Sequence, residues 1–289
     1  MLKFLILILL SILGAVAGEN YFYGLNYGVN QDACPSYENI KADFEQIKKY
    51  TNRVRTFSLS VCNEGALALQ AANELGMNIY LGMWIDRPDT FNSEIAALKN
   101  ILANSQQQSL DKIDAIIVGS EVLYRKDTDE NTLANWIGTV GDLVKPKGIS
   151  VTTADVYYEF PPVVVEKLDF LMMNAFPYWE GVTADQGAST LMDHYDSVVQ
   201  KANGKPVRIS ETGWPSSGGN FGASVASPAN QKLYLSNVLC VTRQRNIDLI
   251  YFSARDEPYK DGVEAYWGVM NSDFTLKSDL PATLLANPC

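Results

Sequence analysis

Short apolar runs recur along the chain, and each is followed by a polar loop and then by a helical stretch. Continuous apolar runs such as Ala115-Ile116-Ile117-Val118 are typical of parallel strands, which are buried on both faces. The predicted strands cover residues 21–27, 53–57, 78–83, 115–119, 150–154, 170–174, 207–210 and 249–254. The helical stretches between them cover residues 37–50, 63–76, 94–108, 130–144, 190–202 and 228–245.

Eight strand–helix units with a mean step of about 32 residues predict an α/β fold, a (β/α)8 TIM barrel with an open substrate cleft at its C-terminal face. A doubly wound open sheet is the alternative. That fold usually places a glycine-rich phosphate loop after its first strand, and Tyr27-Gly28-Val29-Asn30 is not such a loop. The sequence contains no linker and no low-complexity stretch, so we expect one catalytic domain over residues 18–289.

The first 17 residues have the pattern of a secretory signal peptide. Lys3 supplies a positive charge, residues 4–13 are apolar except for Ser11, and Ala15-Val16-Ala17 offers a cleavage site with small residues. The apolar run is too short to span a bilayer. We therefore expect a secreted protein, extracellular or in a cell wall, whose mature form is soluble and has no membrane segment.

Composition and charge narrow the range of partners. The 289 residues are 47% hydrophobic, which excludes a disordered chain or a coiled coil. The 33 acidic residues exceed the 23 basic ones, and a net charge of −10 repels nucleic acid. The single histidine, His194, lies on a predicted outer helix, where we expect it to be solvated. We expect no metal and no cofactor.

Four cysteines in a secreted chain allow three pairings. Cys34 and Cys62 each follow a predicted strand and lie on neighbouring loops, so we pair them. Cys240 would then tie a late helix to Cys289, the last residue. Free buried thiols are the alternative, although an oxidising compartment disfavours them.

The residues just past each predicted strand point into one mouth of such a barrel. Carboxylates and aromatic rings dominate there, and these groups bind sugars through hydroxyl hydrogen bonds and ring stacking. These positions hold Tyr27, Arg55, Trp84, Asp86, Glu121, Asp155, Tyr157, Asn174, Tyr178, Trp179, Glu211, Trp214, Asp256 and Glu257.

Glu121 and Glu211 end the fourth and seventh predicted strands, which face each other obliquely across a barrel. A retaining glycosidase needs two carboxyl groups about 5–5.5 Å apart, one to protonate the leaving oxygen and one to attack the anomeric carbon. Two glutamates at strand ends are weak evidence by themselves, because surface loops are rich in glutamate.

The residues around both glutamates make the case specific. The segment Ile209-Ser210-Glu211-Thr212-Gly213-Trp214-Pro215-Ser216 resembles the nucleophile segment of glycoside hydrolase family 17, whose members act on β-1,3-glucan, and Val118-Gly119-Ser120-Glu121 resembles its acid/base segment. Four further motifs match this family along nearly the whole mature chain: Tyr27-Gly28, Arg55-Thr56-Phe57, Asn174-Ala175-Phe176-Pro177-Tyr178 and Asp256-Glu257-Pro258-Tyr259-Lys260. The chain lacks plant-type insertions and contains the run Glu121-Val122-Leu123-Tyr124-Arg125, and in both respects it resembles the compact fungal cell-wall branch, which includes endo-glucanases and glucanosyltransferases.

The resemblance implies that Glu211 is the nucleophile and Glu121 the general acid/base. Arg55 is the nearest cation that could keep Glu211 ionised. Partial burial and the charge of Glu211 should raise the pKa of Glu121, so that it starts the cycle protonated. Tyr27 would hydrogen-bond near the nucleophile or pack in the barrel mouth. The expected substrate-binding residues are Tyr27, Arg55, Tyr124, Tyr157, Tyr178, Trp179, Glu180, Trp214, Glu257 and Lys260.

Four residues depart from the family pattern. Ser120 stands where related barrels often have asparagine, and Phe57 stands where the family often has tyrosine. Arg255 replaces an apolar or aromatic residue, and Arg208 interrupts the apolar seventh strand. None of these changes removes a catalytic carboxyl group.

The glycosyl-enzyme can pass its sugar to water or to another glucan chain. Tyr124, Trp179 and Glu180 could form an acceptor platform on the leaving-group side, so the sequence favours a 1,3-β-glucanosyltransferase acting on β-1,3-glucan and laminari-oligosaccharides. A hydrolytic endo-1,3-β-glucanase is the alternative. Glu257 and Lys260 match cleft positions of the family, although they could simply pair with each other.

Two other function classes stay open at the level of sequence. A non-catalytic glucan-binding barrel would usually lose one carboxylate, whereas this chain keeps both. A barrel hydrolase acting on β-1,4-glucan or mannan could use the same pair. We expect a monomer.

Overall fold

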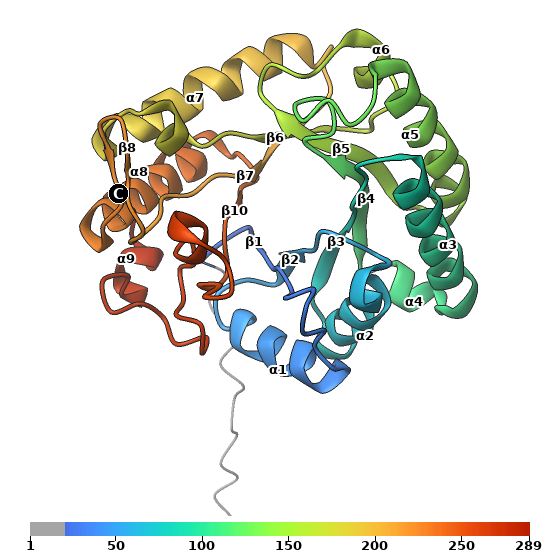
Figure 1. Ribbon diagram of the computed structural model, residues 1–289, viewed down its shortest axis with the longest axis horizontal. Helices are drawn as coiled ribbons and strands as arrows, with labels where there is room; N and C mark the ends of the chain where they lie inside the picture. The colour runs from blue at the N-terminus through green and yellow to red at the C-terminus, as the bar shows by residue number, and fades with distance from the viewer. Residues whose placement is uncertain (1–20) are drawn as a thin grey trace, which may run out of the picture.

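Among the residues that the structure describes, eight parallel strands form the centre of the protein. The computed structural model describes residues 21–289, so the predicted signal peptide lies outside the described residues. The strands stand in the order β10-β1-β2-β3-β4-β5-β6-β7 and form the ring seen in Figure 1. Their bounds are β1 Gly24–Asn26, β2 Arg53–Arg55, β3 Asn78–Met83, β4 Ile113–Ser120, β5 Ser150–Val156, β6 Leu171–Asn174, β7 Val207–Glu211 and β10 Ile250–Tyr251.

The ring closes between β7 and β10. Ile209 and Leu249 form a parallel bridge there, and the Phe252 amide donates to the Thr212 carbonyl oxygen at 2.9 Å. All pairings within the sheet are parallel, and the core strands such as β4 are almost entirely buried. The predicted (β/α)8 TIM barrel is therefore confirmed.

The helices surround the ring on its outside (Figure 1). Their bounds are α1 Tyr37–Ile47, α2 Glu64–Leu75, α3 Pro88–Asn104, α4 Gln107–Leu110, α5 Glu130–Val144, α6 Pro162–Val165, α7 Ala184–Lys201, α8 Pro228–Arg245 and α9 Ala282–Ala286. Within residues 21–289, four single turns of 3₁₀ helix add to them: η1 Val61–Asn63, η2 Lys145–Lys147, η3 Pro177–Glu180 and η4 Gly262–Ala265. No helix among residues 21–289 combines the length and apolarity needed to cross a bilayer.

Helix boundaries follow the sequence where capping residues mark them. Helix α8 begins after Ser227, whose Oγ accepts a hydrogen bond from the Asn230 amide at 3.2 Å, and α2 ends at Gly76, whose φ is +68°. Helix α3 begins at residue 88 and α7 at residue 184, each six residues before the predicted start. Their first six residues hold only one large apolar side chain between them, Phe91, so they lack the repeated apolar spacing that marks the rest of each helix.

A short hairpin was not foreseen. Strands β8 (Asn220–Phe221) and β9 (Ser224–Val225) pair between β7 and α8. Each strand has two residues, which is too short to give an alternating pattern in the sequence. The hairpin matters because Phe221 reaches the cleft described below.

Both predicted disulfides are present. Cys34–Cys62 joins the loops after β1 and β2, with 5.2 Å between the Cα atoms, and Cys240–Cys289 joins α8 to the last residue, with 5.0 Å between the Cα atoms. Both Cα separations lie in the usual range for a disulfide. The first bond ties loops at the mouth of the barrel, and the second ties the C-terminal tail to the outer layer.

Arg208, unexpected in an apolar strand, lies at the opposite end of the barrel from the strand C-termini. Its Cζ atom is 3.9 Å from the Phe170 ring centroid, and its Nη1 donates to the Tyr80 hydroxyl at 2.8 Å. Nε is 3.0 Å from Asp248 Oδ2. The guanidinium group therefore fills the barrel floor while its charge is paired, which explains why strand β7 accepts an arginine.

Candidate active site

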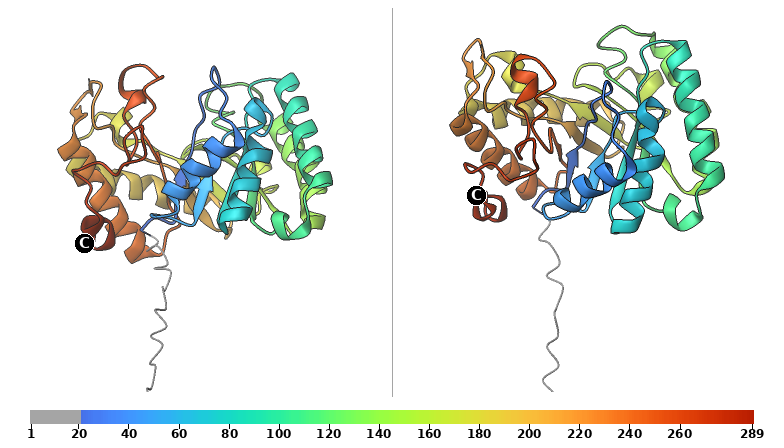
Figure 2. Two further views of the ribbon diagram at one scale, coloured as in Figure 1. Left: turned by 90° about the horizontal axis from the view of Figure 1, so that it is seen from below. Right: turned by 60° about the horizontal axis from the view of Figure 1, so that its bottom comes forward.

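Two adjoining pockets open at the C-terminal ends of the strands, and Glu121, Glu211 and Phe252 line both of them. The narrow pocket has a volume of about 290 Å³ and lies against the loops after β1, β2, β3 and β10. The wide pocket has a volume of about 660 Å³ and lies against the loops after β4, β5 and β6 and the β8–β9 hairpin. Together they form the open cleft that was expected, and Figure 2 shows the loops rising on this side of the barrel.

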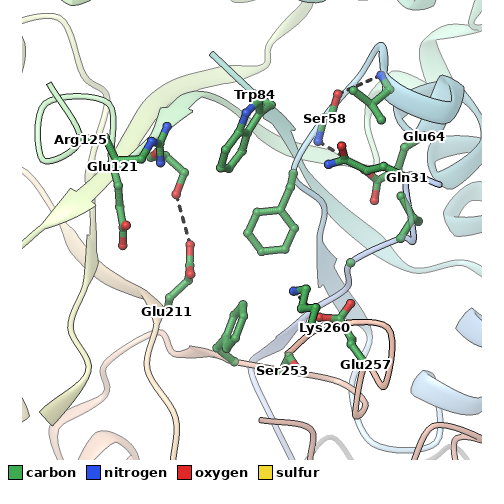
Figure 3. A pocket seen from close by; sticks show the side chains of 16 residues that line it. Gln31, Ser58, Glu64, Trp84, Glu121, Arg125, Glu211, Ser253, Glu257 and Lys260 are labelled. Carbon is green, nitrogen blue, oxygen red and sulfur yellow. Dashed lines mark hydrogen bonds and ion pairs between the residues drawn. The ribbon is translucent and has the colours of Figure 1, made fainter. Parts of the chain in front are cut away.

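Glu121 and Glu211 meet at the junction of the two pockets (Figure 3). Glu211 is the last residue of β7, and Glu121 follows the last residue of β4. Nδ2 of Asn174, at the end of β6, donates to Glu121 Oε1 at 3.0 Å and to Glu211 Oε1 at 2.9 Å. The two acceptor oxygens cannot lie farther apart than the sum of these distances, about 5.9 Å. One amide thus holds both carboxyl groups together.

Three donors surround the carboxylate of Glu211, which is only 7% exposed. Arg55 Nη1 lies 2.5 Å from Oε1, and Ser120 Oγ donates to the same oxygen at 3.2 Å. The third donor is Asn174. Arg55 Nη2 also donates to Ser120 Oγ at 3.1 Å, so the serine hydroxyl bridges the guanidinium group and the carboxylate. This environment stabilises a negative charge on Glu211.

Glu121 has the opposite electrostatic setting. Burial raises its pKa, and the negative charge of nearby Glu211 raises it further, while the Asn174 hydrogen bond and two arginines act in the other direction. The two carboxyl groups are thus differentiated by their surroundings: one is paired with a cation, and the other retains a proton to higher pH.

The backbone of Glu121 is left-handed, with φ of +58°, which is uncommon for a residue with a side chain. The Glu121 amide donates to the Ala154 carbonyl at 2.8 Å, and its own carbonyl accepts from the Arg125 amide at 2.9 Å. Asp155 accepts from the Leu123 amide at 3.0 Å. These bonds fix the turn that aims the Glu121 side chain into the cleft.

Asp155 is the buried residue that holds this turn. The sequence places it at a strand end but predicts no role for it. Its oxygens accept from the Leu123 and Val156 amides, and burial raises its pKa to about 7. It contacts backbone and lines neither pocket. Asp155 is therefore a support for the loop that carries Glu121.

Aromatic rings border the wide pocket. The expected residues Tyr124, Tyr157, Trp179 and Glu180 all line it, and Tyr124 and Trp179 remain 49% and 42% exposed. Rings that were not among the expected substrate-binding residues join them: Tyr158, Phe176, Phe221 and Trp267. Phe221 comes from the hairpin, so the sequence offered no signal for its position.

Glu257 and Lys260 line the narrow pocket as expected, and they also pair with each other. Lys260 Nζ lies 2.6 Å from Glu257 Oε2. Glu257 Oε1 lies so close to Gly28 that a Cβ atom at position 28 would approach it to 2.6 Å, which explains why the first loop has glycine there. Figure 3 shows this pair across the hollow from Glu121 and Glu211.

Four expected substrate-binding residues line neither pocket: Arg55 is buried and contacts Glu211, and the other three lie behind the cleft wall. The Tyr27 hydroxyl donates to Asp43 Oδ2 on α1 at 2.7 Å. The Tyr178 hydroxyl donates to the Gly219 carbonyl at 3.1 Å, and Trp214 Nε1 donates to the Val225 carbonyl at 2.9 Å. All three are buried and line neither pocket. The chain turns after each strand end and directs these side chains outward, between the barrel and its covering elements.

The expectation of a solvated His194 was wrong. Its side chain is only 15% exposed, and Nε2 lies 2.8 and 2.9 Å from the two carboxylate oxygens of Glu180. The reason is that η3 folds back over α7 and brings Glu180 above the histidine.

Among residues 21–289, no group of three or more His, Cys, Asp or Glu side chains is arranged to hold a metal ion. The polar side chains that meet at the junction of the two pockets are the carboxyl pair, Arg55, Ser120 and Asn174. A model of the BtgE/BtgC glycoside hydrolase domain matches residues 24–268. The chain belongs to this glycoside hydrolase family.

Relatives of this glycoside hydrolase family match over most of the chain. A Schizosaccharomyces pombe protein named glucan 1,3-beta-glucosidase is 33% identical over 268 residues, covering 86% of this chain and 83% of that protein. The crystal structure of a glycoside hydrolase family 17 β-1,3-glucanosyltransferase from Rhizomucor miehei is 62% identical, with a TM-score of 0.90, and covers 94% of this chain and 100% of that one.

An active-site mutant of the Rhizomucor miehei β-1,3-glucanosyltransferase, in complex with laminaritriose, is 63% identical with a TM-score of 0.89. It covers 91% of this chain and 98% of that one. The resemblance to glycoside hydrolase family 17 is thus confirmed.

Two of the residues that depart from the family pattern, Ser120 and Phe57, lie at the cleft. Ser120 bonds both Arg55 and Glu211, and the amide near the carboxyl pair comes from Asn174 instead. Phe57 lines the narrow pocket, and the Arg55 guanidinium lies 4.7 Å from its ring centroid. Arg255 lines neither pocket; its guanidinium lies 4.8 Å from the Phe274 ring centroid.

Proposed function

We propose that the protein is a 1,3-β-glucanosyltransferase, which cleaves a β-1,3-glucan and transfers the released glycosyl group to a second glucan chain. The observation that supports this proposal most strongly is the bridging contact of Asn174. It limits the two carboxyl oxygens to about 5.9 Å, near the 5–5.5 Å of retaining enzymes and short of the 6.5–9.5 Å of inverting ones. Only the retaining route passes through a covalent intermediate that a sugar can intercept.

In the first half-reaction Glu121 gives its proton to the glycosidic oxygen, and Glu211 attacks the anomeric carbon. The bond between that carbon and the leaving oxygen breaks, and an ester to Glu211 forms. The ester carries no negative charge, so one of the two effects that raise the pKa of Glu121, the charge of Glu211, is removed while burial remains. Glu121 then accepts the proton of an acceptor hydroxyl, whose oxygen attacks the anomeric carbon and releases Glu211.

The wide pocket supports transfer over hydrolysis. The chain leaving Glu121 places Tyr124 in this pocket, which favours the pocket as the leaving-group and acceptor side. The exposed rings of Tyr124 and Trp179, which come from the loops after β4 and β6, offer faces on which sugar rings can stack. An acceptor bound there competes with water for the glycosyl-enzyme intermediate. An endo-1,3-β-glucanase remains the second candidate, because relatives from Aspergillus species are named as probable glucan endo-1,3-beta-glucosidases.

Timed product analysis with laminari-oligosaccharides of defined length tests this function. We expect products longer than the substrate from the outset, and none from Glu211→Ala. A wild-type enzyme that releases only shorter products would be a hydrolase, and activity on cellulose or mannan in place of laminarin would remove the proposed substrate class.

Substitutions in the wide pocket should change the fate of the intermediate. We expect Tyr124→Ala and Trp179→Ala to raise the ratio of hydrolysis to transfer several-fold, because each removes about one ring contact to the acceptor. Tyr27→Phe, which removes only a hydroxyl bonded to Asp43, is the matched control and should keep the wild-type ratio. If Tyr124→Ala and Trp179→Ala keep the same ratio of hydrolysis to transfer as Tyr27→Phe, the wide pocket does not bind the acceptor.

We also propose that residues 1–17 are a cleaved signal peptide and that residues 18–289 act as one secreted catalytic domain, a monomer without nucleic-acid partners. Two disulfides suit an oxidising compartment, and both carboxyl groups of the site come from one chain. N-terminal sequencing of the protein from culture medium, together with light scattering, tests both points. A retained Met1 would refute the cleaved signal peptide, and the mass of a dimer would refute the monomer.

A further inference from the structure

His194 connects two loops that line the wide pocket. Nε2 lies 2.8 and 2.9 Å from the carboxylate oxygens of Glu180, and the imidazole stacks on Tyr157 with 3.5 Å between ring centroids and 9° between planes. Glu180 ends η3, after β6, whereas Tyr157 follows β5. His194 itself lies on α7 and lines neither pocket. One imidazole from the outer layer therefore contacts both loops at once.

We propose that His194 is a positioning residue that holds Glu180 and Tyr157 in the geometry in which the wide pocket receives the sugar acceptor. This role rests on the proposed transferase function. The histidine acts through its two neighbours and does not contact the acceptor.

Glu180 needs such a partner. Its side chain is 31% exposed, and within residues 21–289 its carboxylate has no hydrogen-bond partner other than His194. Gly181, with φ of +74°, ends the turn directly after it. A free glutamate would lose rotamer freedom on binding a sugar hydroxyl, and the contact with His194 removes that freedom beforehand.

Tyr157 contacts two neighbouring rings. The imidazole covers one face of its ring, and the Tyr158 ring meets it edge-on at 5.0 Å. Tyr158 in turn meets Tyr124 at 6.3 Å, so a row of rings runs from His194 to the exposed rim. Displacement of Tyr157 would therefore change the rim on which the acceptor is expected to stack.

Helix α7 does not depend on His194 for its place in the fold. Leu191, Met192 and Val198 are its buried residues on the surrounding turns, and they pack against the core. A substitution at position 194 should therefore leave the barrel folded. It should act on the wide pocket, which makes the role testable.

The test separates the acceptor step from the donor step. With an aryl β-laminarioside donor, release of the aryl group without acceptor reports formation of the glycosyl-enzyme, and titration with laminaritriose reports acceptor binding. We expect His194→Ala to raise the acceptor KM about three- to tenfold and to lower the transfer-to-hydrolysis ratio similarly, with aryl release retained. Asp193→Ala, an exposed neighbour on the same helix, is the matched control and should match wild type.

Two further variants divide the role into its parts. His194→Gln keeps a donor for Glu180 and loses the stack, whereas His194→Phe keeps the stack and loses the donor. We expect each to restore part of the acceptor affinity that His194→Ala loses. In a Glu180→Ala background, His194→Phe should add no further loss, because the bond that it removes is already gone.

An unchanged acceptor KM in folded His194→Ala would overturn the proposal, and so would an equal loss in donor and acceptor steps, which indicates a general structural role. If wild type makes no product longer than its substrate, the transferase proposal fails by itself. The positioning role is then decided by titrating laminaritriose into Glu211→Ala with and without His194→Ala. Weaker binding in the double variant supports it, and equal binding refutes it.

Discussion

At the scale of single residues, the junction of the cleft shows how two glutamates acquire different properties. The carboxylate of Glu211 accepts hydrogen bonds from Arg55, Ser120 and Asn174. Glu121 is largely buried beside that charge, and both effects raise its pKa. Both residues are glutamates, so the difference between their electrostatic surroundings arises from neighbouring residues at the ends of β2, β4 and β6.

The raised pKa of Glu121 predicts a pH dependence of the first half-reaction. The acid must be protonated, so activity should persist to higher pH than an ordinary glutamate would allow and then fall as Glu121 loses its proton. Glu121→Gln should lower the rate on laminarin about 10²- to 10⁴-fold and abolish this alkaline limb.

A donor with a good leaving group should lose much less in Glu121→Gln, because its departure needs little protonation. Rates measured from pH 4 to 9 on laminarin and on an aryl donor check both points. An alkaline limb that survives in Glu121→Gln would assign that limb to another group.

At the scale of elements, loops of different origin build the two ends of the cleft. The first disulfide joins loops that contribute Gln31 and Val61 to the narrow pocket, whereas the second lies on the outer layer. The hairpin between β7 and α8 adds Phe221 to the wide pocket. Elements that support the barrel and elements that shape the cleft are thus distinct, and their contributions can be separated by mutation.

Replacing each cysteine pair by serine should show this separation. Both double variants should lose about 2–4 kcal/mol of unfolding free energy, because each bond closes a loop, of 28 or 49 residues in sequence separation. Only Cys34→Ser/Cys62→Ser should also raise the KM for laminarin, since its loops line the cleft. Urea denaturation and steady-state kinetics measure the two effects. An equal KM change in both variants would contradict the assignment.

At the scale of the whole molecule, the fold buries several carboxyl groups. Burial raises the pKa of Glu64 to about 8 and that of Asp155 to about 7, and it raises the pKa of Asp256 despite its pairing with Lys277. In the unfolded chain such groups titrate near pH 4. Between these values the folded state binds more protons than the unfolded state, so stability decreases as pH rises.

The unfolding free energy should therefore fall by a few kcal/mol between about pH 5 and 8. Exposed carboxyl groups with a lowered pKa, such as Glu74, titrate below this window and do not oppose the trend. Glu64→Gln removes one of the responsible groups and should flatten the slope. Urea midpoints measured at each pH check this. A wild-type stability that rises toward pH 8 would show that these groups keep ordinary pKa values in the fold.

The sequence by itself determined the barrel, both disulfides and the carboxyl pair at its mouth. Continuous apolar runs at regular spacing leave few ways to bury eight strands, and in a barrel the strand order fixes which ends meet. It also predicted that Tyr124, Trp179 and Glu180 lie at the cleft, and all three line the wide pocket.

Only the tertiary structure decided which way each side chain points after a strand ends. It directed Tyr27, Tyr178 and Trp214 away from the cleft, and it brought His194 beneath Glu180. Loop backbones set these directions through turns such as the left-handed one at Glu121, and contacts between distant elements hold them in place. A local pattern of residues carries no record of such contacts.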